Sequence, residues 1–161
     1  MQSNIISSPE LASQGHQKIE WVRRNMPILS QLEDQFAQER PFAGKRVTVC
    51  IHLEAKTAYL ALVLRAGGAT VSVTGSNPES TKDDVVAALA EEGLHVYARH
   101  GASPEEMRRY MSIALELQPH VVIDDGGDLV ELLHESQRQH GEQMLGACEE
   151  TTSGVLRARA R

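Results

Sequence analysis

The sequence lacks the features that mark membrane, secreted and disulfide-rich proteins. No apolar stretch approaches the roughly 20 residues that a membrane-spanning helix needs, and residues 1–15 are polar, without the apolar core of a signal peptide. The two cysteines, Cys50 and Cys148, stand far apart and form no C-x-x-C motif. We therefore expect a cytoplasmic protein with two free thiols and no membrane partner.

Motifs for metal ions, nucleic acids and nucleotide phosphates are also missing. The seven histidines are scattered, and none belongs to an H-E-x-x-H frame, so we expect no metal site. The net charge is −6 and basic residues gather only at Arg157, Arg159 and Arg161, which argues against nucleic acid as a partner. No G-x-G-x-x-G, G-x-x-x-x-G-K-[ST] or G-x-S-x-G motif occurs, so no residue of this chain is assigned to a cofactor.

What remains is the pattern of one ordinary globular domain. The chain has 161 residues, of which 41% are hydrophobic, and it contains no internal repeat. Residues 1–15, rich in Ser and Gln, suggest a flexible leader, and residues 16–161 a single domain. A helical stripe of apolar residues at spacings of three and four covers residues 18–38, with a break expected just before Pro27.

Short apolar runs then alternate with helical patterns. The expected strands cover residues 47–53, 70–74, 94–98, 120–123 and 145–148, and the expected helices cover 55–65, 80–92, 103–117, 128–139 and 153–161. Ser103 followed by Pro104 and Glu106 is a strong helix start, and Ser80 or Thr81 is the expected cap of the helix before it. This alternation indicates an α/β fold, a Rossmann-like three-layer sandwich with a mainly parallel sheet of four to five strands.

The most informative segment is an apolar run that ends in acids and glycines. His120-Val-Val-Ile-Asp-Asp-Gly-Gly-Asp128 reads as a buried strand followed by a tight turn. Because successive strand residues face opposite ways, at most one of Asp124 and Asp125 points into a given cleft. Carboxyl ends of parallel strands are where open α/β sheets bind ligands. The alternative is an acidic turn that only caps the next helix.

Polar clusters follow the other expected strands as well, at 52–57, 75–81 and 149–154. A histidine and carboxylates at one sheet edge can share a proton-transfer task, and carboxylates also accept hydrogen bonds from ribose hydroxyls and a purine amine. Each residue has a plainer alternative: His52 as a structural histidine, Glu54 and Lys56 as first-turn helix charges, and Glu149-Glu150 as a solvated pair. The four clusters at a common edge favour a ligand site.

These clusters resemble S-adenosyl-L-homocysteine hydrolase. The resemblance rests on the segments 21–29, 50–60, 75–84, 124–129 and 149–155, which keep the family's order and spacing. It implies reversible hydrolysis of S-adenosyl-L-homocysteine to adenosine and L-homocysteine, with a tightly held NAD that oxidises the ribose 3′-hydroxyl. By resemblance, His52 and Asp125 are the catalytic residues, and the substrate-binding residues are Glu54, Lys56, Thr57, Asp125 and Glu150. The Glu-Ala-Lys at 54–56 is a variant on the adenine side.

The resemblance also implies a much longer enzyme, whose NAD-binding domain has no counterpart in this chain. We therefore expect a truncated substrate-binding portion that is inactive alone and binds no NAD, with a small-molecule nucleoside as its ligand. The alternative is a non-catalytic truncated homologue that serves as a nucleoside-binding or regulatory module. An unrelated flavodoxin-like response domain is a weaker reading, because its acids follow the first and third strands. An apolar face left by an absent domain would favour a homo-oligomer.

Overall fold

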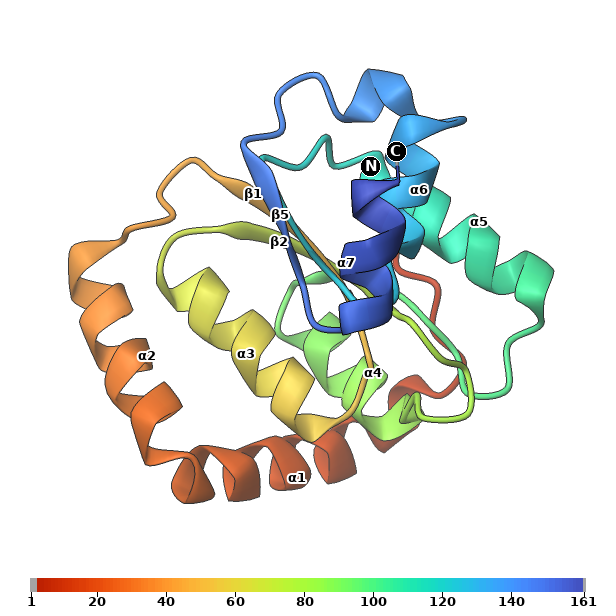
Figure 1. The fold of residues 1–161 in the computed structure, drawn as a ribbon. Helices are drawn as coiled ribbons and strands as arrows, with labels where there is room; N and C mark the ends of the chain where they lie inside the picture. Colours follow the sequence, from red (N-terminus) through yellow and green to blue (C-terminus); the bar gives the residue numbers. More distant parts are fainter. Residues whose placement is uncertain (1–2, 161) are drawn as a thin grey trace.

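Five parallel strands form the centre of the molecule. The computed structural model describes residues 3–160, and its single sheet has the order β3-β2-β1-β4-β5 (Figure 1). The strands are β1 (Arg46–Ile51), β2 (Thr70–Gly75), β3 (His95–Tyr97), β4 (Val121–Asp124) and β5 (Gly146–Glu149). The register pairs the ends of neighbouring strands to within one residue, so all carboxyl ends lie at the same edge of the sheet.

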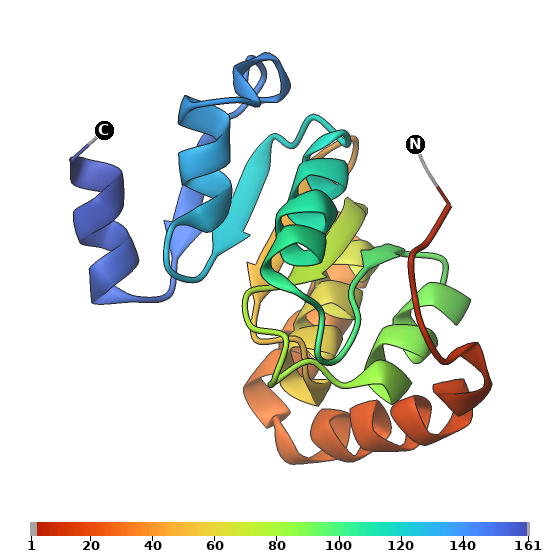
Figure 2. The same cartoon turned by 90° about the vertical axis from the view of Figure 1, so that its right-hand side faces the viewer.

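Helices cover both faces of the sheet. The helices are α1 (Ala12–Asn25), α2 (Pro27–Glu39), α3 (Ala55–Ala66), α4 (Asp83–Glu91), α5 (Pro104–Leu115), α6 (Asp128–His134) and α7 (Thr152–Arg159), with 3-10 turns at Pro9–Leu11 and Arg138–His140. One face carries α3 and α4, with α1 and α2 packed outside them. The other face carries α5 and α6, and α7 lies beside α6 at the β5 edge (Figure 2).

The expected fold class is confirmed. The central strands β1 and β2 are rich in β-branched residues and buried on both faces, as a sheet between two helical layers requires. Ser103 accepts a hydrogen bond from the backbone N–H of Glu106, and the Glu106 side chain accepts one from the Ser103 N–H, so the expected capping box is present. Within residues 3–160, no helix is long and apolar enough to cross a membrane.

Regular structure begins earlier in the chain than the helical pattern of the sequence suggested. The first helix begins at Ala12 rather than near residue 18, and the Ile5 backbone pairs with β3. Gly15 explains the close docking of α1, because a Cβ at this position would lie 2.0 Å from the carbonyl oxygen of Asp84 in α4. The expected break before Pro27 is confirmed, with α1 ending at Asn25 and α2 beginning at the proline.

Two helix boundaries also differ from expectation. Neither Ser80 nor Thr81 caps α4; both hydroxyls donate to the carbonyl oxygen of Asn77, and Lys82 precedes the helix without a side-chain cap. Helix α6 ends at His134 instead of near residue 139, because Glu135 leaves helical backbone angles. The sequence offers no glycine or proline stop at that point, so the pattern gave no sign of it.

Candidate functional site

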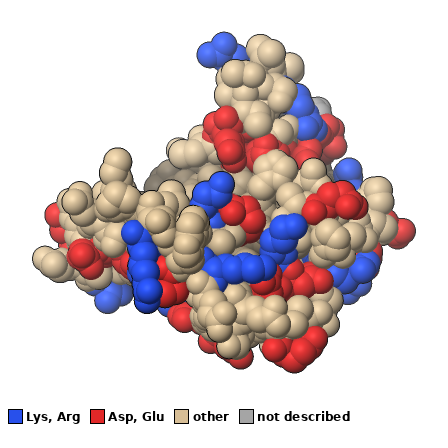
Figure 3. All heavy atoms as spheres, turned by 90° about the horizontal axis from the view of Figure 1, so that it is seen from below, with Lys and Arg blue, Asp and Glu red and all other residues tan. Residues whose placement is uncertain are grey.

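Four strands each place a polar residue immediately beyond their last residue. Ser76 follows β2, His52 follows β1, Asp125 follows β4 and Glu150 follows β5. Since these strands are neighbours in the order β2-β1-β4-β5, the four residues form one row along the carboxyl edge. The sequence expectation that the polar clusters share one edge is therefore met by the topology. Figure 3 views the molecule toward this edge, where basic and acidic side chains are interspersed.

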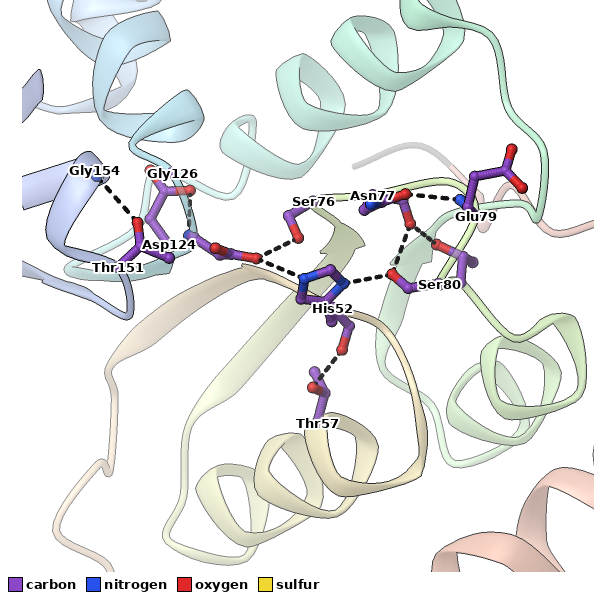
Figure 4. A network of polar contacts seen from close by, with 12 residues as sticks. His52, Thr57, Ser76, Asn77, Glu79, Ser80, Asp124, Gly126, Thr151 and Gly154 are labelled. Atoms are coloured by element: carbon purple, nitrogen blue, oxygen red, sulfur yellow. Dashed lines mark hydrogen bonds and ion pairs between the residues drawn. The ribbon is translucent and has the colours of Figure 1, made fainter.

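His52 is the centre of a polar network in this row. Its Nε2 lies 3.5 Å from Oδ2 of Asp125, and its Nδ1 lies 2.6 Å from Oγ of Ser80 (Figure 4). Thr57 donates its hydroxyl to the His52 carbonyl oxygen at 2.5 Å, which ties the end of β1 to the first turn of α3. The imidazole is 51% exposed, so it is held by partners on both sides while open to a ligand.

The loop after β2 supplies the partners of both members of this pair. Ser76 donates its hydroxyl to Oδ2 of Asp125 at 2.7 Å. The Asn77 carbonyl oxygen accepts from Ser80 and from Thr81, both at 3.0 Å, and these bonds fold the loop so that Ser80 reaches His52. The sequence had marked this loop as a cluster, but it did not single out Ser76 or Ser80 as partners of the two predicted catalytic residues.

The adjacent acids Asp124 and Asp125 have opposite environments, as strand alternation predicted. Asp125 is 12% exposed and faces His52, whereas Asp124 is fully buried and accepts from the backbone N–H groups of Val130 and Asp125. Burial raises the pKa of Asp124 to about 6, although these two hydrogen bonds act in the opposite direction. Asp124 therefore fixes the turn into α6 and leaves the cleft to Asp125.

Glu149 closes the same turn from β5. Its Oε1 accepts from the Gly126 N–H at 2.8 Å and from the Thr151 N–H and hydroxyl at 2.9 and 2.6 Å. Burial alone would raise the pKa of Glu149, but these hydrogen bonds outweigh it, and the pKa is lowered. Of the acidic pair, Glu149 is thus a structural residue, and the exposed Glu150 is the one that lines a cavity.

That cavity, which we call the nucleoside-sized cavity, has a volume of about 630 Å³. Its polar lining consists of His52, Glu54, Lys56, Thr57 and Glu150. Its apolar lining comes from α2, the residue before it, and the strand and helix beneath: Met26, Ile28, Leu29, Leu32, Ile51 and Leu60. Every predicted substrate-binding residue except Asp125 lines this cavity. Asp125 contacts His52, which is one of the lining residues. The apolar lining, the apolar wall of the cavity, was not predicted from the sequence.

Glu54 and Lys56 occupy the first turn of α3. Oε1 of Glu54 caps the helix by accepting from the backbone N–H groups of Lys56 and Thr57 at 3.0 and 3.4 Å. The Lys56 ammonium lies 4.0 Å from the same oxygen and is 66% exposed. Glu54 is therefore a helix cap, and the pair also lines the cavity. Within residues 3–160, no group of three His, Cys, Asp or Glu side chains is arranged to hold a metal ion.

The fold and the row of side chains define a class of protein: a Rossmann-like α/β domain with an acid–histidine site beside a cavity at the carboxyl edge of its sheet. A profile of the S-adenosyl-L-homocysteine hydrolase family matches residues 4–157, so the chain belongs to this family.

Named relatives agree with this assignment. The chain is 51% identical to the adenosylhomocysteinase of Pyrococcus abyssi and 45% identical to the S-inosyl-L-homocysteine hydrolase of Methanocaldococcus jannaschii, each over 150 residues. It is 44% identical to the adenosylhomocysteinase of a Nostoc species over 151 residues. Each match covers 93% of this chain and 36% of the relative.

The family uses NAD, and the residues of this chain do not fit that cofactor. A dinucleotide pyrophosphate takes the backbone N–H groups at the turn after the first strand. Here those groups, on Lys56 and Thr57, are already bound by the Glu54 carboxylate. The glycine-containing turn after β4, at Gly126 and Gly127, is bordered by Asp124, Asp125, Asp128 and Glu149, and the N–H group of Gly126 is already bound by the Glu149 carboxylate.

Proposed function

We propose that this chain supplies the substrate-binding portion of an adenosylhomocysteinase, which hydrolyses S-adenosyl-L-homocysteine reversibly to adenosine and L-homocysteine. The observation that carries the proposal is the 3.5 Å contact between Nε2 of His52 and Oδ2 of Asp125 beside the nucleoside-sized cavity. An exposed imidazole next to a carboxylate is suited to moving a proton at a bound sugar.

His52 and Asp125 have separate tasks in this proposal. His52 handles the proton at the sugar C5′ and the leaving thiol, and Asp125 contacts the ribose and is the candidate base for the C4′ proton. Ser76 donates to Asp125 and so orients its carboxylate. Glu150, on the far side of the same row, accepts hydrogen bonds from ribose hydroxyls. The three groups approach the sugar from loops of three different strands, which fixes its orientation.

The purine lies against Glu54 and Lys56 in this arrangement. The relatives act, by name, on S-adenosyl- and S-inosyl-L-homocysteine, whose bases differ at position 6. Adenine presents a donor at that position beside an acceptor, and hypoxanthine presents an acceptor beside a donor. Glu54 is an acceptor and Lys56 a donor, so the pair complements a purine edge of either kind. The apolar wall from α2 covers the faces of the base.

Binding of adenosine tests the proposal directly. Isothermal titration of the chain with adenosine and with inosine should give measurable binding, and the tighter nucleoside identifies the base. Asp125→Asn should weaken binding about tenfold or more, because a hydrogen bond to a charged group contributes about 1.5–3 kcal/mol. Asp34→Asn, which changes an exposed acid in α2 outside the cavity, is the matched control and should bind like the wild type. Equal affinity of wild type and Asp125→Asn would contradict the proposed site.

A nucleoside-binding module without catalysis is the second candidate. It is favoured by the misfit of the β1–α3 turn to NAD, because the family reaction needs a hydride acceptor. We expect no homocysteine release when the chain is incubated with S-adenosyl-L-homocysteine and NAD and sampled with a thiol reagent. A protein blank without substrate is required, because Cys148 is exposed. Release above this blank and above a second blank without protein would refute the module and establish catalysis by the chain itself.

A further inference from the structure

A second cavity opens at the same sheet edge, on the opposite face. It has a volume of about 640 Å³ and lies between the amino-terminal halves of α5 and α6 and the loop after β2. The nucleoside-sized cavity lies on the face that carries α2 and α3. The two cavities share no lining residue, so the second one is a separate space at the edge.

Ser76 connects the second cavity to the His52–Asp125 pair. Its side chain lines the cavity, and its hydroxyl donates to Oδ2 of Asp125 at 2.7 Å. Asp125 in turn lies 3.5 Å from Nε2 of His52, which lines the nucleoside-sized cavity. A ligand with two parts can therefore reach both cavities by passing over the pair at which the proposed bond cleavage takes place.

The second cavity combines an apolar floor with charges of both signs. Met107 and Met111 of α5 are buried and supply soft, polarisable thioether surface. Arg108 and Glu105, one turn apart on the same helix, are exposed at the rim. Neither makes a hydrogen bond or ion pair within residues 3–160, so both keep their full bonding capacity for a ligand.

The acids of α6 are in a different state. Asp128 lines the cavity, but Arg157 of α7 donates to its Oδ1 at 2.9 Å and also binds Glu131. Both acids thus have Arg157 as a partner, although one guanidinium leaves these two carboxylates with a net negative charge. The charged lining residues without such a partner are one cation and one anion, Arg108 and Glu105. A short ligand with a carboxylate, an ammonium group and an apolar chain matches this lining, and a polyanion such as a phosphate ester does not.

We propose that the second cavity binds the amino-acid half of the thioether substrate. Arg108 takes the α-carboxylate, Glu105 takes the α-ammonium group, and the methylene and sulfur atoms lie against Met107 and Met111. This assignment rests on the proposed function, since it requires the nucleoside half to lie on the other side of the His52–Asp125 pair. It makes Arg108 the residue that distinguishes a homocysteine thioether from a bare nucleoside.

The test compares two ligands that differ only by the amino-acid half. Titration of the chain with S-adenosyl-L-homocysteine should give at least tenfold tighter binding than titration with adenosine under the same conditions. Arg108→Met replaces the guanidinium side chain by an apolar one of similar length. It should lower the affinity for S-adenosyl-L-homocysteine about tenfold and leave the affinity for adenosine unchanged. Arg109→Met is the matched control, because Arg109 is exposed on the same helix but does not line the cavity.

The outcomes separate this inference from the proposed function. Equal affinities for the two ligands, or an Arg108→Met effect of equal size on both, would overturn the inference while leaving the nucleoside site in place. Binding of S-adenosyl-L-homocysteine that depends on Arg108, in a chain that does not bind adenosine, would support the inference and contradict the base site. Absence of binding by either ligand overturns both.

Discussion

The centre and the β5 edge of the sheet are built very differently. In β1 and β2 all residues beyond the first are buried, and α3 and α5 cover them. In β5 the first three residues are exposed, and in α7 the only buried residue is Gly154 among those that the structure describes. The edge also carries the exposed apolar side chains Leu145 and Leu156. Packing therefore stabilises the centre and contributes little at the edge.

The candidate site draws on both regions. His52 and Ser76 extend from the buried strands, whereas Glu150 extends from the exposed one. The neighbouring turns after β4 and β5 are secured by hydrogen bonds more than by apolar packing, because Glu149 binds Gly126 and Thr151, and Thr151 binds Gly154. In the proposed site, the contact of Glu150 with the ribose would thus depend on a weakly packed edge. The exposed leucines at this edge favour self-association of the chain, a prediction that sedimentation at increasing protein concentration tests.

The sharpest test of this contrast is a pair of leucine substitutions. Leu115 is fully buried at the end of α5, and Leu156 is 65% exposed on α7. Leu115→Ala should lower the free energy of unfolding by about 2–5 kcal/mol, because it leaves a cavity in the core. Leu156→Ala should change it by less than about 0.5 kcal/mol. Urea unfolding of the two variants measures both, and equal destabilisation would abolish the distinction between the regions.

The pH dependence of Asp124 tests the junction of centre and edge. The pKa of Asp124 is raised from 3.8 to about 6 in the folded chain, so the folded state holds this proton more tightly than the unfolded state. Its contribution to stability is therefore largest at low pH and is lost as the pH rises through about 6. Asp124→Asn has no such titration, so its stability relative to wild type should increase by about 1 kcal/mol between pH 5 and pH 7.5.

The difference in stability between wild type and Asp124→Asn removes the contribution of the histidines, which are the same in both proteins. His95 and His120 have lowered pKa values, mainly through burial, and they are present in both proteins. Glu149, whose pKa is lowered by its hydrogen bonds, is likewise present in both proteins. A wild-type minus variant difference that stays constant between the two pH values would show that Asp124 is not buried as described.

The sequence predicted the layout of the site because that layout follows from topology. Short β-branched runs alternating with helices indicate a parallel sheet, and a parallel sheet brings the residues after its strands to one edge. The polar clusters that contain His52, Asp125 and Glu150 could be placed together on that ground, and the family resemblance singled out these three residues. Strand alternation also predicted that only one of Asp124 and Asp125 would face the cleft, and Asp125 does.

The parts that escaped prediction depend on how elements pack and loops fold. The apolar stripe with Met26, Leu29 and Leu32 indicated a helix, but periodicity does not say which surface the stripe covers, and here it walls the cavity. The roles of Ser76 and Ser80 depend on the turn that Asn77 organises through its carbonyl oxygen, a contact between backbone and side chain with no sequence spacing of its own. The end of α6 has no residue signal either.

The smallest expected effect separates two helix caps of the same chemistry. Ser103 accepts from the Glu106 N–H at the start of α5, and Thr151 accepts from the Gly154 N–H at the start of α7. Ser103→Ala should lower the free energy of unfolding by about 1 kcal/mol, because α5 belongs to the cooperative core. Thr151→Ala should lower it by a few tenths at most, because α7 can open without the rest of the molecule, and amide exchange in α7 should become faster instead. If Thr151→Ala lowers the free energy of global unfolding as much as Ser103→Ala does, the β5 edge is part of the cooperative unit.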